Sequence, residues 1–114
     1  MASSTVNRLP FSASPPHVLS IAGSDPSGGA GIQADLKTFS SLGCYGMSIV
    51  TALTAQNTKG VTQIHIPPVE FFKSQIRALR DDVEIDAIKI GMLGNREVIL
   101  ALSEELQTFT RIGE

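Results

Sequence analysis

A glycine-rich stretch between an apolar run and an amphipathic run constrains this chain more than any other feature. The apolar run covers residues 17–21, and the stretch that follows, residues 23–31, carries four glycines. Apolar residues then recur at helical spacing from Ile32 to Leu42, and Gly43 is a suitable stop. This order predicts a strand, a turn and a helix whose N-terminus faces a ligand, because glycine permits close backbone approach and the first N–H groups of a helix are free.

Two common phosphate-binding patterns fit this stretch poorly. Gly23 and Gly28 have the spacing of a P-loop, but Gly29 and Ala30 stand where Lys and Ser or Thr are required. Residues 29–34 match the dinucleotide-binding pattern in form, yet the region about twenty positions later lacks the acidic residue that holds a ribose. We therefore assign neither type of nucleotide loop.

The rest of the chain alternates between strand and helix patterns. Residues 47–53 indicate a buried strand, residues 61–66 an exposed or edge strand, and residues 85–90 an interior strand. Further helices are expected after Pro67 and after Asn95, which is a good N-cap residue. Strands that alternate with helices predict an α/β fold, with a mostly parallel sheet covered by helices on both faces.

The predicted strand ends converge on one place. In a parallel sheet, ligands bind in the crevice beyond the carboxyl ends of the strands. Residues 22–30, 54–58 and 91–93 each follow a predicted strand. The strand pattern alone therefore predicts a small-molecule pocket built from these three segments.

Composition and charge narrow the function classes. Hydrophobic residues make up 42% of the chain and charged residues 18%, which is typical of a globular protein. A net charge of −2 and the lack of a long apolar stretch lead us to expect neither nucleic acid nor membrane as a partner. The single cysteine, Cys44, excludes an internal disulfide framework and fits a reducing compartment, and no residue spacing indicates a metal site. We expect a cytoplasmic location.

The first sixteen residues differ from the rest, because they are rich in Ser and Pro and contain no acid. We interpret residues 1–16 as a disordered tail and residues 17–114 as the folded part of the chain, which is the amino-terminal part of a larger domain. A short organellar targeting segment is the alternative, since such peptides are also Ser-rich and poor in acids.

Three segments resemble the hydroxymethylpyrimidine and phosphomethylpyrimidine kinases of thiamine biosynthesis, in the same order and spacing. They are AGSDPSGGAGIQADLK at residues 22–37, TALTAQNT at 51–58 and KIGML at 89–93. The resemblance extends from about residue 18 to residue 106. It implies a ribokinase-like three-layer α/β fold that is much longer than this chain. We therefore expect the chain to be truncated to the amino-terminal half of that fold.

The resemblance also implies a reaction. It is the ATP-dependent phosphorylation of 4-amino-5-hydroxymethyl-2-methylpyrimidine and then of its monophosphate. This chain would supply the acceptor-binding half, with a small-molecule pyrimidine as its partner. ATP and Mg²⁺ would be bound mainly by the carboxyl-terminal half, which also carries the catalytic residue, so the 114-residue chain alone is expected to be inactive. The full-length protein is expected to be a homo-oligomer. Two alternatives stay open: a pyridoxal kinase of the same superfamily, or a catalytically dead fragment.

Five residues are expected to bind the acceptor: Gln56, Asp35, Met92, Ala30 and Thr54. Gln56 follows an apolar strand, where an amide needs partners, and its donor and acceptor match the ring nitrogen and amine of an aminopyrimidine. Asp35 lies on the border of a helical apolar stripe, and the resemblance implies that it accepts a hydrogen bond from the substrate. The resemblance also implies that Met92 flanks the ring, while Ala30 and Thr54 contribute backbone contacts.

The loop itself is assigned to five residues, Gly23, Asp25, Gly28, Gly29 and Gly31. Asp25 precedes a proline and could simply organise the turn. Lys89 stays unassigned, because it could neutralise a phosphate at the end of the sheet or pair with Asp86. No residue of this chain is assigned as catalytic. Cys44 is expected to be a small packed side chain.

Overall fold

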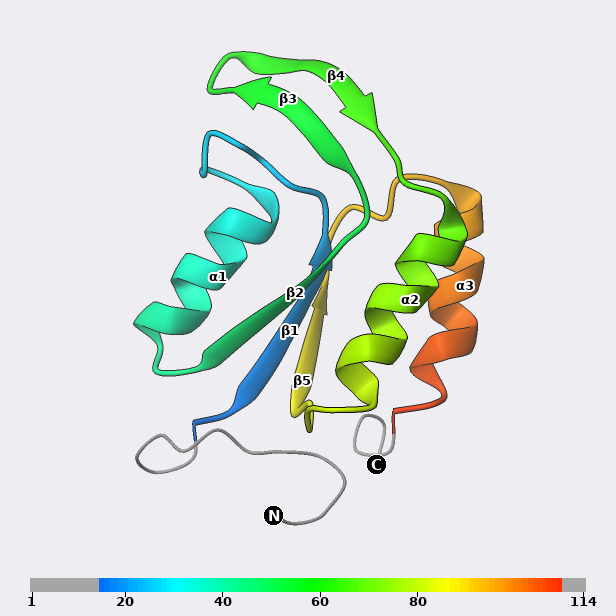
Figure 1. The fold of residues 1–114 in the computed structure, drawn as a ribbon. Coiled ribbons are helices and arrows are strands. Elements are labelled where there is room, and N and C mark those ends of the chain that lie inside the picture. The colour runs from blue at the N-terminus through cyan, green and yellow to red at the C-terminus, as the bar shows by residue number, and fades with distance from the viewer. Residues whose placement is uncertain (1–14, 110–114) are drawn as a thin grey trace.

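A parallel three-stranded sheet forms the centre of the fold. In the computed structural model, which describes residues 15–109, β1 (His17–Ala22) lies between β2 (Tyr45–Val50) and β5 (Ala87–Ile90) (Figure 1). Leu19 of β1 is in register with Met47 on one side and Ile88 on the other, and both pairings are parallel. The carboxyl ends of the three strands therefore meet at one edge of the sheet.

Helices cover both faces of this sheet. Helix α1 (Gly31–Ser41) lies against one face, while α2 (Val69–Arg80) and α3 (Arg96–Leu106) lie against the other (Figure 1). The alternation of β1 explains the division, since successive side chains point to opposite faces. Ser20 bonds to Asp35 of α1, whereas Leu19 belongs to the core beneath α2 and α3.

The main core lies between the sheet and the α2–α3 pair. Its buried members come from β1, β2, both helices and the segments beside them: Leu19, Ile21, Ile49, Phe72, Ile76, Ile85, Val98, Ala101, Leu102 and Phe109. Each large apolar side chain contributes about 1.5–3 kcal/mol by leaving water. Glu105 of α3, 8% exposed, accepts hydrogen bonds from Arg80 at 3.0 Å and Arg77 at 3.3 Å, which joins the two helices.

Above the carboxyl edge of the sheet stands an antiparallel hairpin. It consists of β3 (Leu53–Asn57) and β4 (Gly60–His65), which form a separate two-stranded sheet (Figure 1). The prediction of one strand over residues 47–53 is therefore wrong, because β2 ends at Val50 and the chain turns into β3. Backbone bonds mark this exit, with Thr51 N donating to Ala22 O and Ser24 N donating to Ala52 O, both at 2.9 Å.

The other elements follow the sequence pattern closely. The three predicted helices are present, and Asn95 caps α3 by accepting a hydrogen bond from Val98 N at 2.9 Å. The strand expected over residues 85–90 is β5, but it occupies an edge of the described sheet and leaves Ile90 45% exposed. The predicted tail lies almost wholly outside the described residues, which begin at residue 15.

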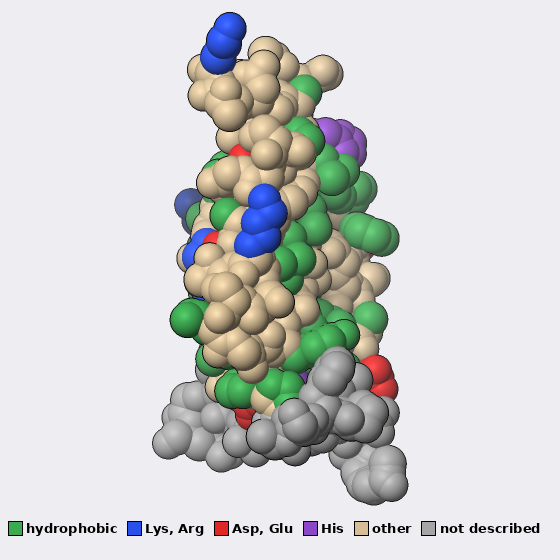
Figure 2. All heavy atoms as spheres, turned by 90° about the vertical axis from the view of Figure 1, so that its left-hand side faces the viewer, with side chains coloured by type: hydrophobic (Ala, Val, Ile, Leu, Met, Phe, Trp, Pro, Cys, Tyr) green, Lys and Arg blue, Asp and Glu red, His purple; other side chains and the backbone are tan. Residues whose placement is uncertain are grey.

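The surface of residues 15–109 has neither a membrane-spanning helix nor, on the side of α1, a cluster of basic side chains. None of the helices between residues 15 and 109 combines the length and apolarity that a membrane crossing requires. Figure 2 looks onto the side covered by α1, where uncharged and hydrophobic areas dominate and the basic side chains are scattered. This face offers no concentrated positive patch of the kind that binds nucleic acid.

Candidate functional site

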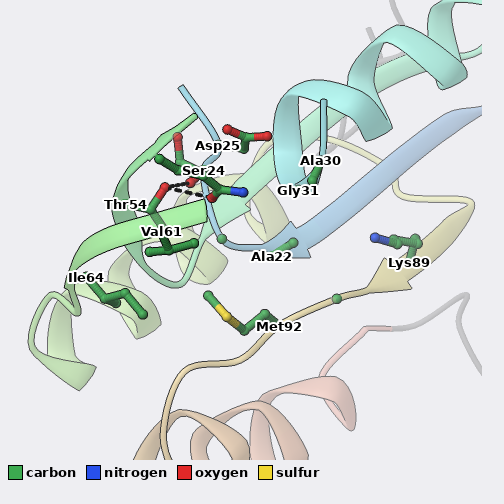
Figure 3. A pocket seen from close by; sticks show the side chains of 13 residues that line it. Ala22, Ser24, Asp25, Ala30, Gly31, Thr54, Val61, Ile64, Lys89 and Met92 are labelled. Atoms are coloured by element: carbon green, nitrogen blue, oxygen red, sulfur yellow. Dashed lines mark hydrogen bonds between the residues drawn. The ribbon is translucent and has the colours of Figure 1, made fainter. Parts of the chain in front are cut away.

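A cavity of about 290 Å³ lies between the carboxyl edge of the sheet and the hairpin (Figure 3). This volume is close to the lower end of the range for small-molecule sites. Four segments line it: the end of β1 with its loop, the start of α1, the hairpin, and the end of β5. The residues are Ala22, Gly23, Ser24, Asp25, Ala30, Gly31, Thr54, Gln56, Val61, Ile64, Lys89, Gly91 and Met92.

Asp25 organises the glycine-rich loop from inside. Its carboxylate accepts hydrogen bonds from Ser27 N at 2.9 Å, Ser27 Oγ at 2.7 Å and Gly29 N at 3.1 Å. The Ser27 hydroxyl is the largest cause that holds the pKa of Asp25 below its usual range, with help from backbone N–H groups and against the opposing effect of burial. Asp25 is only 3% exposed, and its carboxylate is stabilised in the ionised form by these hydrogen bonds within its own loop.

The loop folds back onto the end of β1 at Gly31. This residue has a φ of +59°, and a Cβ there would collide with the carbonyl oxygen of Gly23. The same oxygen accepts a hydrogen bond from Ile32 N at 2.9 Å. Only glycine allows this approach, and it brings the start of α1 to the cavity wall. Gly29, by contrast, has room for a side chain.

The hairpin supplies a neutral polar end to the cavity. Thr54 Oγ1 donates to Ser24 O at 2.7 Å, and Gln56 Oε1 stands 3.1 Å from the same hydroxyl (Figure 3). A hydroxyl proton that is shared by two acceptors makes two weaker bonds, whereas the amide of Gln56 turned with its NH₂ group toward Thr54 would donate to the hydroxyl oxygen instead. That orientation leaves the amide oxygen available to a donor on a ligand.

Apolar side chains form the walls beside this polar end. Val61 and Ile64 of β4 and Met92 after β5 surround the same opening in Figure 3, and each is about half exposed. A Cβ on Gly23 would come within 2.8 Å of Met92 Cε. The missing side chain of Gly23 therefore gives the thioether its position at the cavity wall.

A charged cluster occupies the opposite end, beside β5. Asp35 Oδ2 accepts hydrogen bonds from Ser20 Oγ at 2.7 Å and Lys89 Nζ at 2.8 Å. Desolvation acts to raise the pKa of Asp35, but the hydrogen bonds from Lys89 and Ser20 and the charge of Lys89 outweigh it, so the pKa is lowered. Lys89 lines the cavity and is 46% exposed, whereas Asp35 is 16% exposed and is not one of the lining residues.

The predicted site residues fall into two groups. Ala30, Thr54, Gln56 and Met92 line the cavity, as do Gly23, Asp25 and Gly31 of the loop, while Gly28 and Gly29 lie farther out in the loop. Asp35 lies beside the cavity, in contact with Lys89.

Sequence reasoning gave no site role to Val61, Ile64 or Lys89. The irregular alternation of β4 was the available signal for the first two. Lys89 pairs with Asp35, while Asp86 accepts a hydrogen bond from His17 N at 2.8 Å. Over residues 15–109, no three His, Cys, Asp or Glu side chains are grouped so as to hold a metal ion.

Comparisons with known proteins agree on one family. The family model described as phosphomethylpyrimidine kinase matches residues 25–112. The hydroxymethylpyrimidine/phosphomethylpyrimidine kinase of Rhizobium meliloti is 55% identical over 91 residues, which are 80% of this chain and 34% of that protein. The enzyme of the same name from Escherichia coli is 53% identical over 93 residues, which are 82% of this chain and 35% of that protein. This chain thus spans about a third of the length of these relatives.

Similar solved structures include a phosphomethylpyrimidine kinase and pyridoxal kinases. A phosphomethylpyrimidine kinase from Clostridium difficile superposes with a TM-score of 0.80 at 53% identity, covering 82% of this chain and 41% of that one. A pyridoxal kinase from Staphylococcus aureus, in complex with AMP-PCP and pyridoxal, superposes with a TM-score of 0.76 at 38% identity. The match covers 86% of this chain and 37% of that one.

Proposed function

The chain belongs to the phosphomethylpyrimidine kinase family and has the α/β fold of the ribokinase-like kinases; from this we propose that its cavity binds the acceptor substrate of such a kinase. The acceptor is 4-amino-5-hydroxymethyl-2-methylpyrimidine, and its monophosphate in a second step. The observation that carries this proposal is the cavity itself. It joins a neutral amide and hydroxyl at one end, apolar walls in the middle and a cation at the other end.

Each part of the cavity fits one part of that acceptor. The Gln56 oxygen, oriented away from Thr54, would accept a hydrogen bond from the exocyclic amine. Met92, Val61 and Ile64 would enclose the flat ring, since a thioether and branched aliphatic groups pack well on aromatic faces. Ala30, at the start of α1, would present its backbone to the ligand.

Phosphoryl transfer relies mainly on positioning and charge stabilisation. The described residues perform the positioning of the acceptor. They do not form a magnesium site, since the Asp25 carboxylate is engaged by its own loop and Asp35 Oδ2 by Ser20 and Lys89. We therefore propose that ATP and Mg²⁺ are bound mainly by groups outside residues 15–109. ATP as donor is supported by the pyridoxal kinase solved with AMP-PCP.

A pyridoxal kinase activity is the second candidate. The 38% identity with the S. aureus pyridoxal kinase, solved with pyridoxal, favours it as an additional acceptor. Pyridoxal has no exocyclic amine, so it offers Gln56 a weaker match. The two substrates should therefore respond differently to the removal of this amide.

The test is to titrate hydroxymethylpyrimidine and pyridoxal into the chain by calorimetry, with wild type and Gln56→Leu. The substitution keeps much of the volume and removes both donor and acceptor. We expect hydroxymethylpyrimidine to bind about tenfold or more weakly, equivalent to about 1.4 kcal/mol or more, and pyridoxal to lose less.

Gln63→Leu is the matched control. Gln63 lies on the same hairpin, opposite Ala55, and does not line the cavity, so neither affinity should change. Equal losses for both ligands in Gln56→Leu would contradict the pairing with the amine. Failure of the wild-type chain to bind hydroxymethylpyrimidine would contradict the proposed function itself.

A further inference from the structure

Lys89 is a partly exposed charged side chain in the lining of the cavity. Among the described residues that line it, only Lys89 and Asp25 carry a charge. Asp25 is 3% exposed and its carboxylate oxygens accept hydrogen bonds from Ser27 and Gly29, so they are engaged within the loop and not open to direct contact with a ligand. Lys89 is 46% exposed. The exposed charged group of the cavity is therefore the ammonium of Lys89, at the end beside β5.

The ammonium group is held in place by an ion pair with α1 and lies close to the backbone after β5. Asp35 of α1 binds it at 2.8 Å and is itself bound by Ser20 of β1 at 2.7 Å. A Cβ on Gly91 would lie 3.1 Å from Lys89 Nζ, so the group rests close to the backbone just after β5. A lysine that is fixed before binding has already lost much of the side-chain entropy that a flexible surface lysine still has to lose.

This pairing leaves donors for a ligand. An ammonium has three N–H groups, and Asp35 takes one of them. Asp35 does not line the cavity, so a group entering the cavity would meet Lys89 before the carboxylate behind it. Figure 3 shows Lys89 across the opening from Thr54 and Val61, which places the cation at the far end from the neutral polar groups.

We propose that Lys89 binds the phosphate of the phosphorylated acceptor, and that Asp35 and Ser20 are positioning residues for its ammonium group. This inference rests on the proposed function. An alcohol arm needs no cation, whereas a phosphate monoester carries a charge of about −1.5 to −2 at neutral pH. Lysine binds phosphate as a compact point charge. With the ring beside Gln56 and Met92, the arm at the opposite end points to Lys89.

The experiment compares the affinities of two ligands that differ only in the phosphate. Hydroxymethylpyrimidine and phosphomethylpyrimidine are titrated into wild type and Lys89→Met at low ionic strength. We expect Lys89→Met to weaken the monophosphate about tenfold or more and to change the alcohol less than about twofold. Added salt should weaken the wild-type affinity for the monophosphate and leave that for the alcohol unchanged, because the lysine is partly exposed.

Lys37→Met is the matched control. Lys37 lies near the same loop but donates to Gly28 O at 3.1 Å and does not line the cavity, so both affinities should remain as in wild type. Lys89→Arg keeps the charge, and we expect it to retain part of the preference for the monophosphate. If Lys89→Met fails to fold, Lys89→Arg and the salt titration of wild type test whether Lys89 binds the phosphate.

The outcomes separate this inference from the proposed function. If wild type binds both ligands and Lys89→Met weakens both equally, or neither, the phosphate role of Lys89 is overturned while the acceptor site stands. A loss of Mg-ATP affinity in Lys89→Met, with the monophosphate unaffected, would reassign the lysine to the nucleotide and overturn the inference. If wild type binds neither pyrimidine, both proposals fall.

Discussion

Among the glycines between residues 15 and 109, Gly31 is the one where an added Cβ would come closest to another atom. Its φ of +59° and its contact with Gly23 O leave no space for a Cβ. Gly43 also has a positive φ, +79°, but a Cβ there would meet nothing within 4 Å. The two positions therefore separate backbone strain from steric collision within one chain.

We expect Gly43→Ala to cost about 1–2 kcal/mol of unfolding free energy, from left-handed strain alone. Gly31→Ala should cost more and should also abolish binding of hydroxymethylpyrimidine, because the start of α1 would move off Gly23. Urea denaturation and calorimetry measure the two effects. Similar costs for both variants, with ligand binding intact in Gly31→Ala, would show that the loop closes without this contact.

Single site residues were predictable where the family resemblance and the ends of predicted strands pointed to the same positions. Ala30, Thr54, Gln56 and Met92 each follow or begin a predicted element, and each lines the cavity, although their roles in binding stay predictions. Lys89 could not be assigned, because its partner Asp35 stands 54 positions earlier in the chain. A periodic pattern contains no information about such a distant pairing.

At the scale of elements, the sequence indicated the helices and the parallel strands but not β3. Residues 51 and 52 are fully buried, so the apolar run of β2 continues past the point where the strand ends. The end is set by tertiary bonds, among them Thr51 Oγ1 to Met92 O at 2.6 Å. Burial and strand pairing are different properties, and an apolar run reports only the first.

Helix α2 protects the outer edge of β2 with one side chain. Gln75 Oε1 accepts from Val50 N at 2.9 Å, and Gln75 Nε2 donates to Val50 O at 3.0 Å. The amide therefore replaces the strand that would otherwise pair with Val50. An open strand edge exposes such groups to water or to other chains.

Replacing this amide should destabilise the protein measurably. Gln75→Leu leaves one N–H and one C=O of Val50 without their present partners, and we expect a loss of about 2 kcal/mol in urea denaturation. Gln107→Leu, at the exposed C-cap of α3, should change the unfolding free energy by less than about 0.5 kcal/mol. Equal effects of the two substitutions would show that the Val50 edge does not depend on Gln75.

At the scale of the whole molecule, the site depends on topology. The central place of β1 brings its carboxyl end beside those of β2 and β5, so segments far apart in sequence meet at one edge. This convergence was predictable, because parallel strands end on the same side. The hairpin above that edge was not, since β3 and β4 belong to a second sheet whose position follows from contacts such as Thr54 Oγ1 to Ser24 O.

The two sheets differ in how firmly they are held. Leu19 and Ile21 of β1 are 0% exposed, whereas every residue of β4 is exposed. A two-stranded hairpin is marginally stable in water without further packing. We therefore expect the backbone amides of β3 and β4 to exchange with solvent much faster than those of β1, through local opening.

A ligand in the cavity should reduce the difference in hydrogen-exchange rate between the hairpin and β1. If hydroxymethylpyrimidine contacts both Gln56 and the sheet edge, the hairpin cannot open without releasing it. At a ligand concentration about 100 times Kd, exchange of the β3 and β4 amides should slow by up to about 100-fold. The last turn of α3 is the internal control, because its fraying leaves the cavity intact and its exchange should not change. Hydrogen exchange measured by NMR tests this directly, and hairpin amides that remain unprotected at saturation would show that the ligand is held without the hairpin.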